Sequence, residues 1–498
     1  MKKYFAGCSN YGKLIMLIGV LVALPLIVLP FYPEEIKYIP AFLIPSVLSV
    51  ALGLVVCILT SGQEESVTEW QSPLQKGSQP VMFSWCFAIF LGAIPFVLSG
   101  QEGFLHALFE SVSGWTTTGL TVVDIANTPN IFLFHRSFMQ YCGGVGFIIM
   151  IAMIVHVKQA MNLYYAEGHP DRLMPSLKRT AQAIFLLYNG FLLVGTILYR
   201  IFGMGLFDAV CHTMSALSTA GYSTRVGSIG EYESLSIEIV TILLMLIGST
   251  NFAILMLLVK RKFRQVFNIA EIRFVIGLLI VFVPLIAISL NREVGLAIGE
   301  SFHEALFGVV TTFSTTGYST MNYAEWPAFT IGLLILLMII GGGAGSTAGG
   351  IKLSRTYLLI KITRENIRKR ISPARCVTTP SYYSVQGKTL IDDALVKDIF
   401  GFVSCYMGVL IVGTLLITLT AGCSLLDALF EFASAFGTVG ISNGLTNSST
   451  DAATLVVEMA GMLLGRLEIF IVFVGASSIV RTIKRWLRKI IRIMATIK

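Results

Sequence analysis

Four thirteen-residue segments of this chain share one pattern without gaps, and an internal repeat of this kind narrows the possible folds more than any single motif. Each segment opens with Ala and has Ser or Thr at the seventh position, Thr at the eleventh and Gly at the thirteenth. An apolar residue holds the ninth position. The sequence therefore predicts four equivalent structural elements. The segments are 107–119, 209–221, 305–317 and 428–440.

The surroundings of the repeats indicate a membrane protein. Of the 498 residues, 55% are hydrophobic and only 13% are charged, whereas a soluble domain has about 25% charged residues. A transmembrane helix needs about 20 apolar residues, so we expect an all-α polytopic protein with about ten transmembrane helices. The predicted spans are 14–30, 41–61, 81–99, 131–155, 181–199, 237–259, 274–290, 328–340, 398–420 and 455–480.

Each repeat lies between two predicted spans. Its apolar helix of about ten residues is too short to cross a bilayer, so we expect it to be re-entrant. Non-helical backbone at membrane depth is tolerated only inside protein or around a water-filled cavity. The sequence thus predicts four span–pore helix–turn–span units in a pseudo-fourfold arrangement around one axis.

Positive charge is distributed unevenly along the chain. If the spans alternate and both termini are cytoplasmic, 30 of the 36 Lys and Arg residues lie on the cytoplasmic side, as the positive-inside rule requires. The net charge of +8 therefore reflects topology, and we expect no nucleic-acid partner. The eight scattered cysteines include no C-x-x-C motif and are interpreted as buried apolar residues.

The repeat turns have the chemistry of a cation site. A dehydrated cation needs oxygen ligands, and Gly at the centre of a turn permits backbone conformations that aim carbonyls at an ion, as in the filters of potassium channels. Close helix packing by small residues is the alternative, but four copies between spans favour the filter. No carboxylate lies in the turns, which favours K⁺ over Ca²⁺. The predicted filter residues are Thr117, Thr118, Gly119, Thr219, Ala220, Gly221, Thr315, Thr316, Gly317, Thr438, Val439 and Gly440.

Taken with four further motifs, the chain resembles the Trk/Ktr/HKT superfamily of potassium transporters, specifically its TrkH-like bacterial subunits. The resemblance covers nearly the whole chain, including two additional spans before the first repeat. It implies a selectivity filter around the four turn glycines, and Gly rather than Ser at the first of them implies preference for K⁺ over Na⁺. It also implies a homodimer in the bacterial inner membrane, a cytosolic nucleotide-binding TrkA-like regulatory partner, K⁺ as the transported ion and no organic cofactor. The further motifs are 140–146, 248–252, 341–352 and 463–468.

A glycine-rich stretch, 341–350, interrupts the second span of the third repeat. It could be a helix kink or a gate loop below the filter. A phosphate-binding loop is excluded because Gly-Lys-Ser/Thr is absent. Composition does not separate kink from gate, and the resemblance favours the gate. The predicted gate residues are Gly341, Gly342, Gly343, Gly345, Ser346, Thr347, Gly349, Gly350 and Arg466.

Arg466 lies near the middle of the predicted span 455–480, roughly 18 Å from either end at 1.5 Å per residue. Its guanidinium must therefore meet a buried partner or water. It could bind the carbonyls of the gate loop, or form a structural ion pair with Glu458 or Glu468. Glu110 and Glu431 share the fourth position of their repeats and could attract cations or hydrogen-bond the turns from behind.

The predicted organisation is therefore two additional spans, four repeats and a basic amphipathic helix that lies on membrane lipid. A Na⁺- or H⁺-coupled transporter of another cation is the alternative function, although inverted repeats would then be expected. No catalytic motif indicates an enzyme. The predicted boundaries are 1–80, 81–180, 181–268, 269–390, 391–480 and 481–498.

Overall fold

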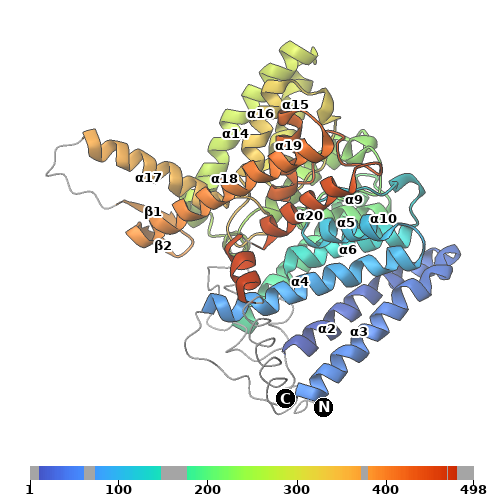
Figure 1. Ribbon diagram of the computed structural model, residues 1–498. Coiled ribbons are helices and arrows are strands. Elements are labelled where there is room, and N and C mark those ends of the chain that lie inside the picture. Colours follow the sequence, from blue (N-terminus) through green and yellow to red (C-terminus); the bar gives the residue numbers. More distant parts are fainter. Residues whose placement is uncertain (1–9, 61–72, 147–176, 372–379, 468, 479–498) are drawn as a thin grey trace.

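The computed structural model describes residues 10–60, 73–146, 177–371, 380–467 and 469–478 (Figure 1). These residues form α-helices, short 3₁₀ segments and one β-hairpin. The predicted C-terminal helix, 481–498, and the basic loop around Lys158 lie outside the described residues.

The N-terminal helices form a pair at one edge of the molecule (Figure 1). They pack closely because small residues face each other: a Cβ on Gly12 would lie 2.9 Å from the carbonyl oxygen of Gly53. Large apolar side chains such as Ile58 and Leu59 face outward, as they would toward lipid. The elements are α2 (Asn10–Ala23), η1 (Leu24–Phe31), η2 (Pro33–Tyr38) and α3 (Ile39–Thr60).

The rest of the chain repeats one order of elements, a long helix, a short helix, a turn and a second helix. The first set is α4 (Pro73–Leu98), α5 (Phe104–Trp115), η3 (Ile125–Asn127) and α6 (Asn130–Val145). The second is α9 (Leu177–Ile201), α10 (Leu206–Leu217), η4 (Ser228–Tyr232), α11 (Leu235–Gly248), α12 (Phe252–Val259) and α13 (Phe263–Asn268). The third is α14 (Ala270–Ser289), η5 (Leu290–Val294), α15 (Ile298–Phe313), η6 (Tyr323–Glu325), α16 (Ala328–Ile339) and α17 (Leu353–Ile371). The fourth is α18 (Asp393–Ala421), α19 (Leu425–Gly437) and α20 (Ala452–Arg466).

The predicted spans 131–155 and 455–480 lie partly outside the described residues. Six described helices have sufficient length and hydropathy, or seven if α11 and α12 count as one span bent by 113°. The second helix of a repeat is interrupted, as at Ser249–Asn251 and at 340–352. In three repeats a glycine of the second helix, Gly143, Gly248 or Gly465, lies directly against the carbonyl of the ninth residue of the same repeat, so this helix approaches the short helix more closely than a side chain would allow.

A β-hairpin, formed by β1 (Ser381–Ser384) and β2 (Gly387–Leu390), connects α17 to α18. The hairpin and α17 project from the helical body (Figure 1). These strands were not predicted from the sequence, because four residues are too few for an alternating pattern to be recognised.

Burial is highest in the short helices. In α5, α10, α15 and α19 nearly every residue from the repeat's opening Ala onward is buried, whereas long helices such as α14 and α18 expose Ile280 and Leu419. The repeat segments therefore form the interior, and the long helices form an apolar exterior.

Candidate functional site

The four short helices end in the same way. The N–H of the twelfth repeat residue donates to the carbonyl of the seventh at 2.8–3.0 Å, and the N–H of the eleventh donates to that of the eighth at 3.1–3.2 Å. This pair of bonds is typical of a helix that ends on a left-handed residue. The N–H groups of each turn are thus used within its own helix.

The eleventh residue of every repeat is a threonine with positive φ, between 52° and 56°. A left-handed backbone is rare for β-branched side chains and costs about 1–2 kcal/mol, so its occurrence at four equivalent places indicates a functional constraint. The glycine two residues later also has positive φ, between 73° and 100°. The left-handed threonines are Thr117, Thr219, Thr315 and Thr438.

The four turns, each formed by the eleventh to thirteenth repeat residues, contact one another in cyclic order. A Cβ on Gly119 would overlap the carbonyl oxygen of Ala220, and one on Gly221 would overlap that of Thr316. The same holds for Gly317 against Val439, and for Gly440 against Thr118, which closes the ring. The structure thus brings all twelve predicted filter residues together. The eleventh and twelfth residues are fully buried, whereas the glycines are partly accessible.

Two tyrosines connect neighbouring repeats. The Tyr222 hydroxyl donates to the carbonyl oxygen of Glu110 at 3.1 Å, and the Tyr318 hydroxyl donates to that of His212 at 3.0 Å. Gln140 adds a further link between the first two repeats, since its amide donates to Ala220 O at 2.7 Å and accepts from Tyr222 N at 3.2 Å. Hydrogen bonds between neighbouring repeats therefore hold the ring at its periphery.

A buried ion pair supports the first turn from behind. Glu110 accepts hydrogen bonds from Thr121 Oγ1 at 2.5 Å and Val122 N at 2.8 Å. Its other oxygen pairs with Arg136 Nε at 2.9 Å, and both side chains are at most 1% exposed. The Arg136 guanidinium also lies over the Tyr222 ring, 3.9 Å from the centroid. Of the two roles considered for Glu110, the contacts are those of a carboxylate that hydrogen-bonds the turn.

In the other three repeats, the residue at the fourth position, which is Glu110 in the first repeat, makes different contacts. Glu431 accepts from Asn443 N and Thr446 N, each at 3.2 Å, and from the Thr446 hydroxyl. His212 binds the Ser223 hydroxyl at 2.9 Å. In the third repeat Gly308 leaves room for the indole of Trp326.

The glycine-rich loop, 341–350, lies against three of the four turns. Thr347 Oγ1 is 3.1 Å from Thr219 Oγ1, and Gly349 N donates to Thr315 Oγ1 at 3.0 Å. A Cβ on Gly349 would overlap Thr438 Oγ1. The base of the loop is closed by Gly341 N, which donates to Ile351 O at 2.9 Å.

Arg466 joins this loop to the second helix of the first repeat. Its guanidinium donates to Thr347 O at 2.5 Å and to Gly143 O at 2.6 Å. Binding of loop carbonyls was one of the two roles predicted for Arg466. Of the two acidic partners considered, Glu458 has its Oε1 2.9 Å from Thr446 Oγ1, and Glu468 lies outside the described residues.

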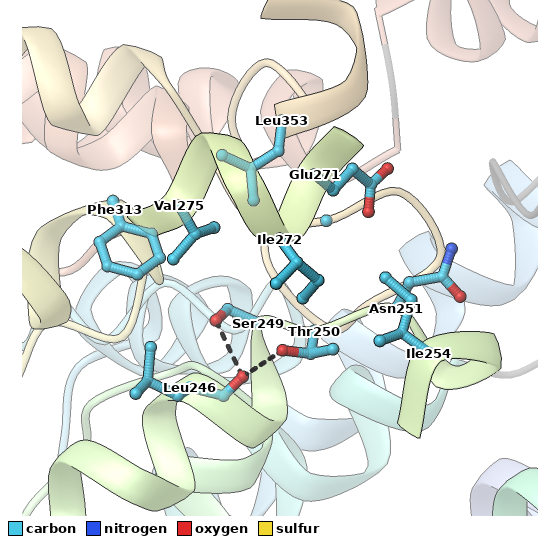
Figure 2. A pocket seen from close by; sticks show the side chains of 11 residues that line it. Leu246, Ser249, Thr250, Asn251, Ile254, Glu271, Ile272, Val275, Phe313 and Leu353 are labelled. Carbon is cyan, nitrogen blue, oxygen red and sulfur yellow. Dashed lines mark hydrogen bonds between the residues drawn. The ribbon is translucent and has the colours of Figure 1, made fainter. Parts of the chain in front are cut away.

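A cavity of about 200 Å³ borders the loop on the side of Gly343. Figure 2 shows its apolar wall, formed by Leu246, Val275 and Phe313, and Glu271 and Asn251 at the opposite side. Ser249 and Thr250 turn their hydroxyls back to Leu246 O, at 3.3 and 2.6 Å. The bend between α11 and α12 thus leaves open space beside the loop.

Sequence reasoning missed the side chains that hold the ring. It noted position fourteen of the repeat only as apolar, although Tyr222 and Tyr318 there carry hydroxyls that contact the preceding repeat. It also placed Arg136 only by topology, and the deep location of this charge in an apolar run was the signal for a buried partner.

A family model and several known proteins match most of this chain, and all of them are cation transport proteins. The TrkH family model, described as cation transport protein, matches residues 48–484. An uncharacterized cation transporter of Methanocaldococcus jannaschii is 30% identical over 96% of this chain and 96% of its own length. The Trk system potassium uptake protein TrkG of Escherichia coli is 29% identical over 93% of this chain and 96% of its own length.

A solved structure is also similar. The crystal structure of the potassium transporter TrkH from Vibrio parahaemolyticus matches with a TM-score of 0.81 and 26% identity, covering 95% of this chain and 98% of that one.

Proposed function

Since this chain belongs to the TrkH family of cation transport proteins, we propose that it is the ion-conducting membrane subunit of a potassium uptake system, with the ring of four turns as its selectivity filter. The observation that carries the proposal is the ring itself. Four left-handed threonines and four left-handed glycines recur at equivalent positions, and each turn contacts the next. The pseudo-fourfold axis of this ring is the proposed ion pathway.

Potassium is the proposed ion for two reasons. Similar proteins are named as potassium uptake proteins. The turns also lack carboxylates and so offer carbonyl and hydroxyl oxygens, which suit a dehydrated monovalent cation. The short helices end at the ring, so the negative ends of their dipoles favour a cation there.

We propose that loop 341–350 is the gate of this pathway. It lies against Thr219, Thr315 and Thr438 at the inner ends of the turns. Arg466 holds it through the Thr347 carbonyl, and its charge repels cations at the same place. The cavity beside Gly343 gives the loop a volume into which it can withdraw.

The remaining proposals concern assembly. We propose a homodimer in a bacterial inner membrane, with cytoplasmic termini and a cytosolic nucleotide-binding TrkA-like regulator. The related proteins belong to a Trk system, which supports a multi-component assembly. Exposed basic side chains on α17 are suited to contact with a cytosolic partner.

The test is K⁺ and Na⁺ flux in proteoliposomes for wild type and Gly119→Ser. Gly119 has φ of +100° and no room for a Cβ, so the substitution must displace the Ala220 carbonyl. We expect the K⁺/Na⁺ flux ratio to fall by about tenfold, equivalent to ~1.4 kcal/mol.

The matched control is Gly100→Ser. Gly100 also has positive φ, +73°, but nothing lies within 4 Å of its Cβ position, so it has the same backbone strain away from the ring. Equal selectivity in wild type and Gly119→Ser would remove the filter assignment.

A further inference from the structure

The fourth repeat contains a buried pair of carboxyl groups joined by one hydroxyl. Glu431 on α19 and Glu458 on α20 are both 0% exposed. Thr446 Oγ1 lies within hydrogen-bond distance of Glu431 Oε1 and is 2.9 Å from Glu458 Oε1. Glu431 also binds the backbone that follows the Gly440 turn. The pair is therefore directly connected to one side of the ring.

Counting the hydrogens available to these contacts points to one proton in the cluster beyond those of the ionised side chains. A threonine hydroxyl has a single hydrogen and can donate only one hydrogen bond. The second short contact to a carboxyl oxygen must then be donated by a carboxylic acid. Glu431 already accepts two backbone N–H groups, which favours its ionised form. Glu458 Oε2 has no hydrogen-bond partner among the described residues, which fits the carbonyl oxygen of a neutral acid.

In the first repeat, an arginine stands at the position that Glu458 occupies in the fourth repeat. Arg136 stands seven residues before Gly143, and Glu458 stands seven residues before Gly465. Both glycines lie against the carbonyl of the ninth repeat residue, Trp115 in one and Phe436 in the other. Arg136 and Glu458 are thus equivalent positions. In the first repeat a guanidinium neutralises the carboxylate behind the turn, whereas the fourth repeat has an acid at that place.

We propose that Glu458, Thr446 and Glu431 form a proton-binding site that holds the fourth turn of the filter in shape. In the protonated state Glu458 donates to Thr446, and Thr446 donates to Glu431. When the pH rises, the proton of Glu458 leaves to water and two buried carboxylates repel each other. The backbone after Gly440 then loses its support. The effect on ion selection rests on the proposed function of the ring, whereas the bound proton does not.

None of the other titratable groups around Glu431 and Glu458 provides the positive charge that Arg136 provides in the first repeat. Asp427 on α19 and the Cys423 thiol after α18 are the neighbours of Glu431. On α5, which packs against α20, Glu110 is paired with Arg136. Helix α18 packs against both α19 and α20; it carries Lys397 and Asp398 near its start, and Cys405 and Tyr406, whose ring stacks on Phe436, further along. Helix α16, which packs against α19, has no titratable side chain. Among the described residues, no salt bridge involves Glu431 or Glu458.

Difference infrared spectroscopy of the purified full chain tests the proton directly. We expect the carbonyl band of a buried carboxylic acid to disappear as the pH is raised, and to be missing at all pH values in Glu458→Gln. Because coupling between two sites is reciprocal, the band should disappear at higher pH in K⁺ than in Na⁺. If the band disappears at the same pH in K⁺ and in Na⁺, the proposed link to ion selection is overturned. If the glutamine variant does not assemble, a wild-type spectrum without such a band overturns the site.

Flux measurements test the consequence. We expect the wild-type K⁺/Na⁺ flux ratio to fall by about fivefold from low to high pH, and the ratio of Glu458→Gln, whose amide still donates to Thr446, to stay constant. Asp427→Asn and Cys423→Ser are the matched controls and should keep the wild-type profile. A Glu458→Gln profile equal to that of wild type would overturn the proposal. An intact infrared band together with a Gly119→Ser variant that keeps the wild-type K⁺/Na⁺ flux ratio would instead count against the filter assignment alone.

Discussion

At the scale of single residues, we propose that Arg466 holds the proposed gate closed. Its guanidinium donates to Thr347 O and Gly143 O, and hydrogen bonds from a charged group contribute about 1.5–3 kcal/mol each. Arg466→Ala removes both bonds and the positive charge. We therefore expect a several-fold higher basal K⁺ flux, measured in proteoliposomes without any cytosolic partner.

Two further variants serve as an intermediate case and as a control for the Arg466→Ala prediction. Lysine keeps the charge but cannot donate in the planar geometry of a guanidinium, so Arg466→Lys should lie between wild type and alanine. Arg292→Ala, at an exposed position, should leave the flux unchanged. A basal flux in Arg466→Ala at or below that of wild type would show that Arg466 does not hold the gate closed.

At the scale of elements, the loop and its neighbouring cavity should act together. If loop 341–350 withdraws toward the space beside Gly343, filling that space must hinder opening. Val275 on α14 lines the cavity, and Val275→Phe adds bulk there. We expect the maximal K⁺ flux to fall several-fold while the K⁺/Na⁺ ratio stays the same, since the ring is not changed.

The control for Val275→Phe is on the same helix. Val281 is 52% exposed on the apolar exterior of α14, so Val281→Phe adds the same volume outside the cavity and should conduct normally. Equal fluxes of the two variants would mean that the loop opens in another direction.

The elements also show what the sequence could and could not predict. The Thr and Gly spacing located the four turns, because glycine at a turn permits positive φ. The glycine-rich stretch predicted the interruption after α16 for the same reason. The left-handed threonines could not be predicted in this way, since β-branched residues rarely adopt that backbone. The link from Tyr222 to Glu110 joins residues 112 positions apart, and no local pattern contains such a contact. The hairpin β1–β2 was missed because its strands have only four residues each.

At the scale of the whole molecule, orientation follows from charge. Basic residues concentrate at one side of the predicted topology, and the positive-inside rule assigns that side to the cytoplasm. The loop before α20 and the hairpin β1–β2 should then lie on opposite sides of the membrane. Single cysteines at exposed Ser448 and Lys388, in a chain with its own eight cysteines replaced, report this arrangement.

We expect a membrane-impermeant thiol reagent to label Ser448→Cys in intact cells, and Lys388→Cys only after permeabilisation. The result bears on the mechanism, because the proposed gate loop lies on the same side of the turns as the hairpin, and the labelling shows which side of the membrane that is. Ions would then meet the ring before the gate on entry, so the filter selects from the external solution and the cytosolic side controls release. Labelling of Lys388→Cys in intact cells would reverse that order, and the ring would then face the potassium-rich cytoplasm, where uptake gains nothing from selecting potassium.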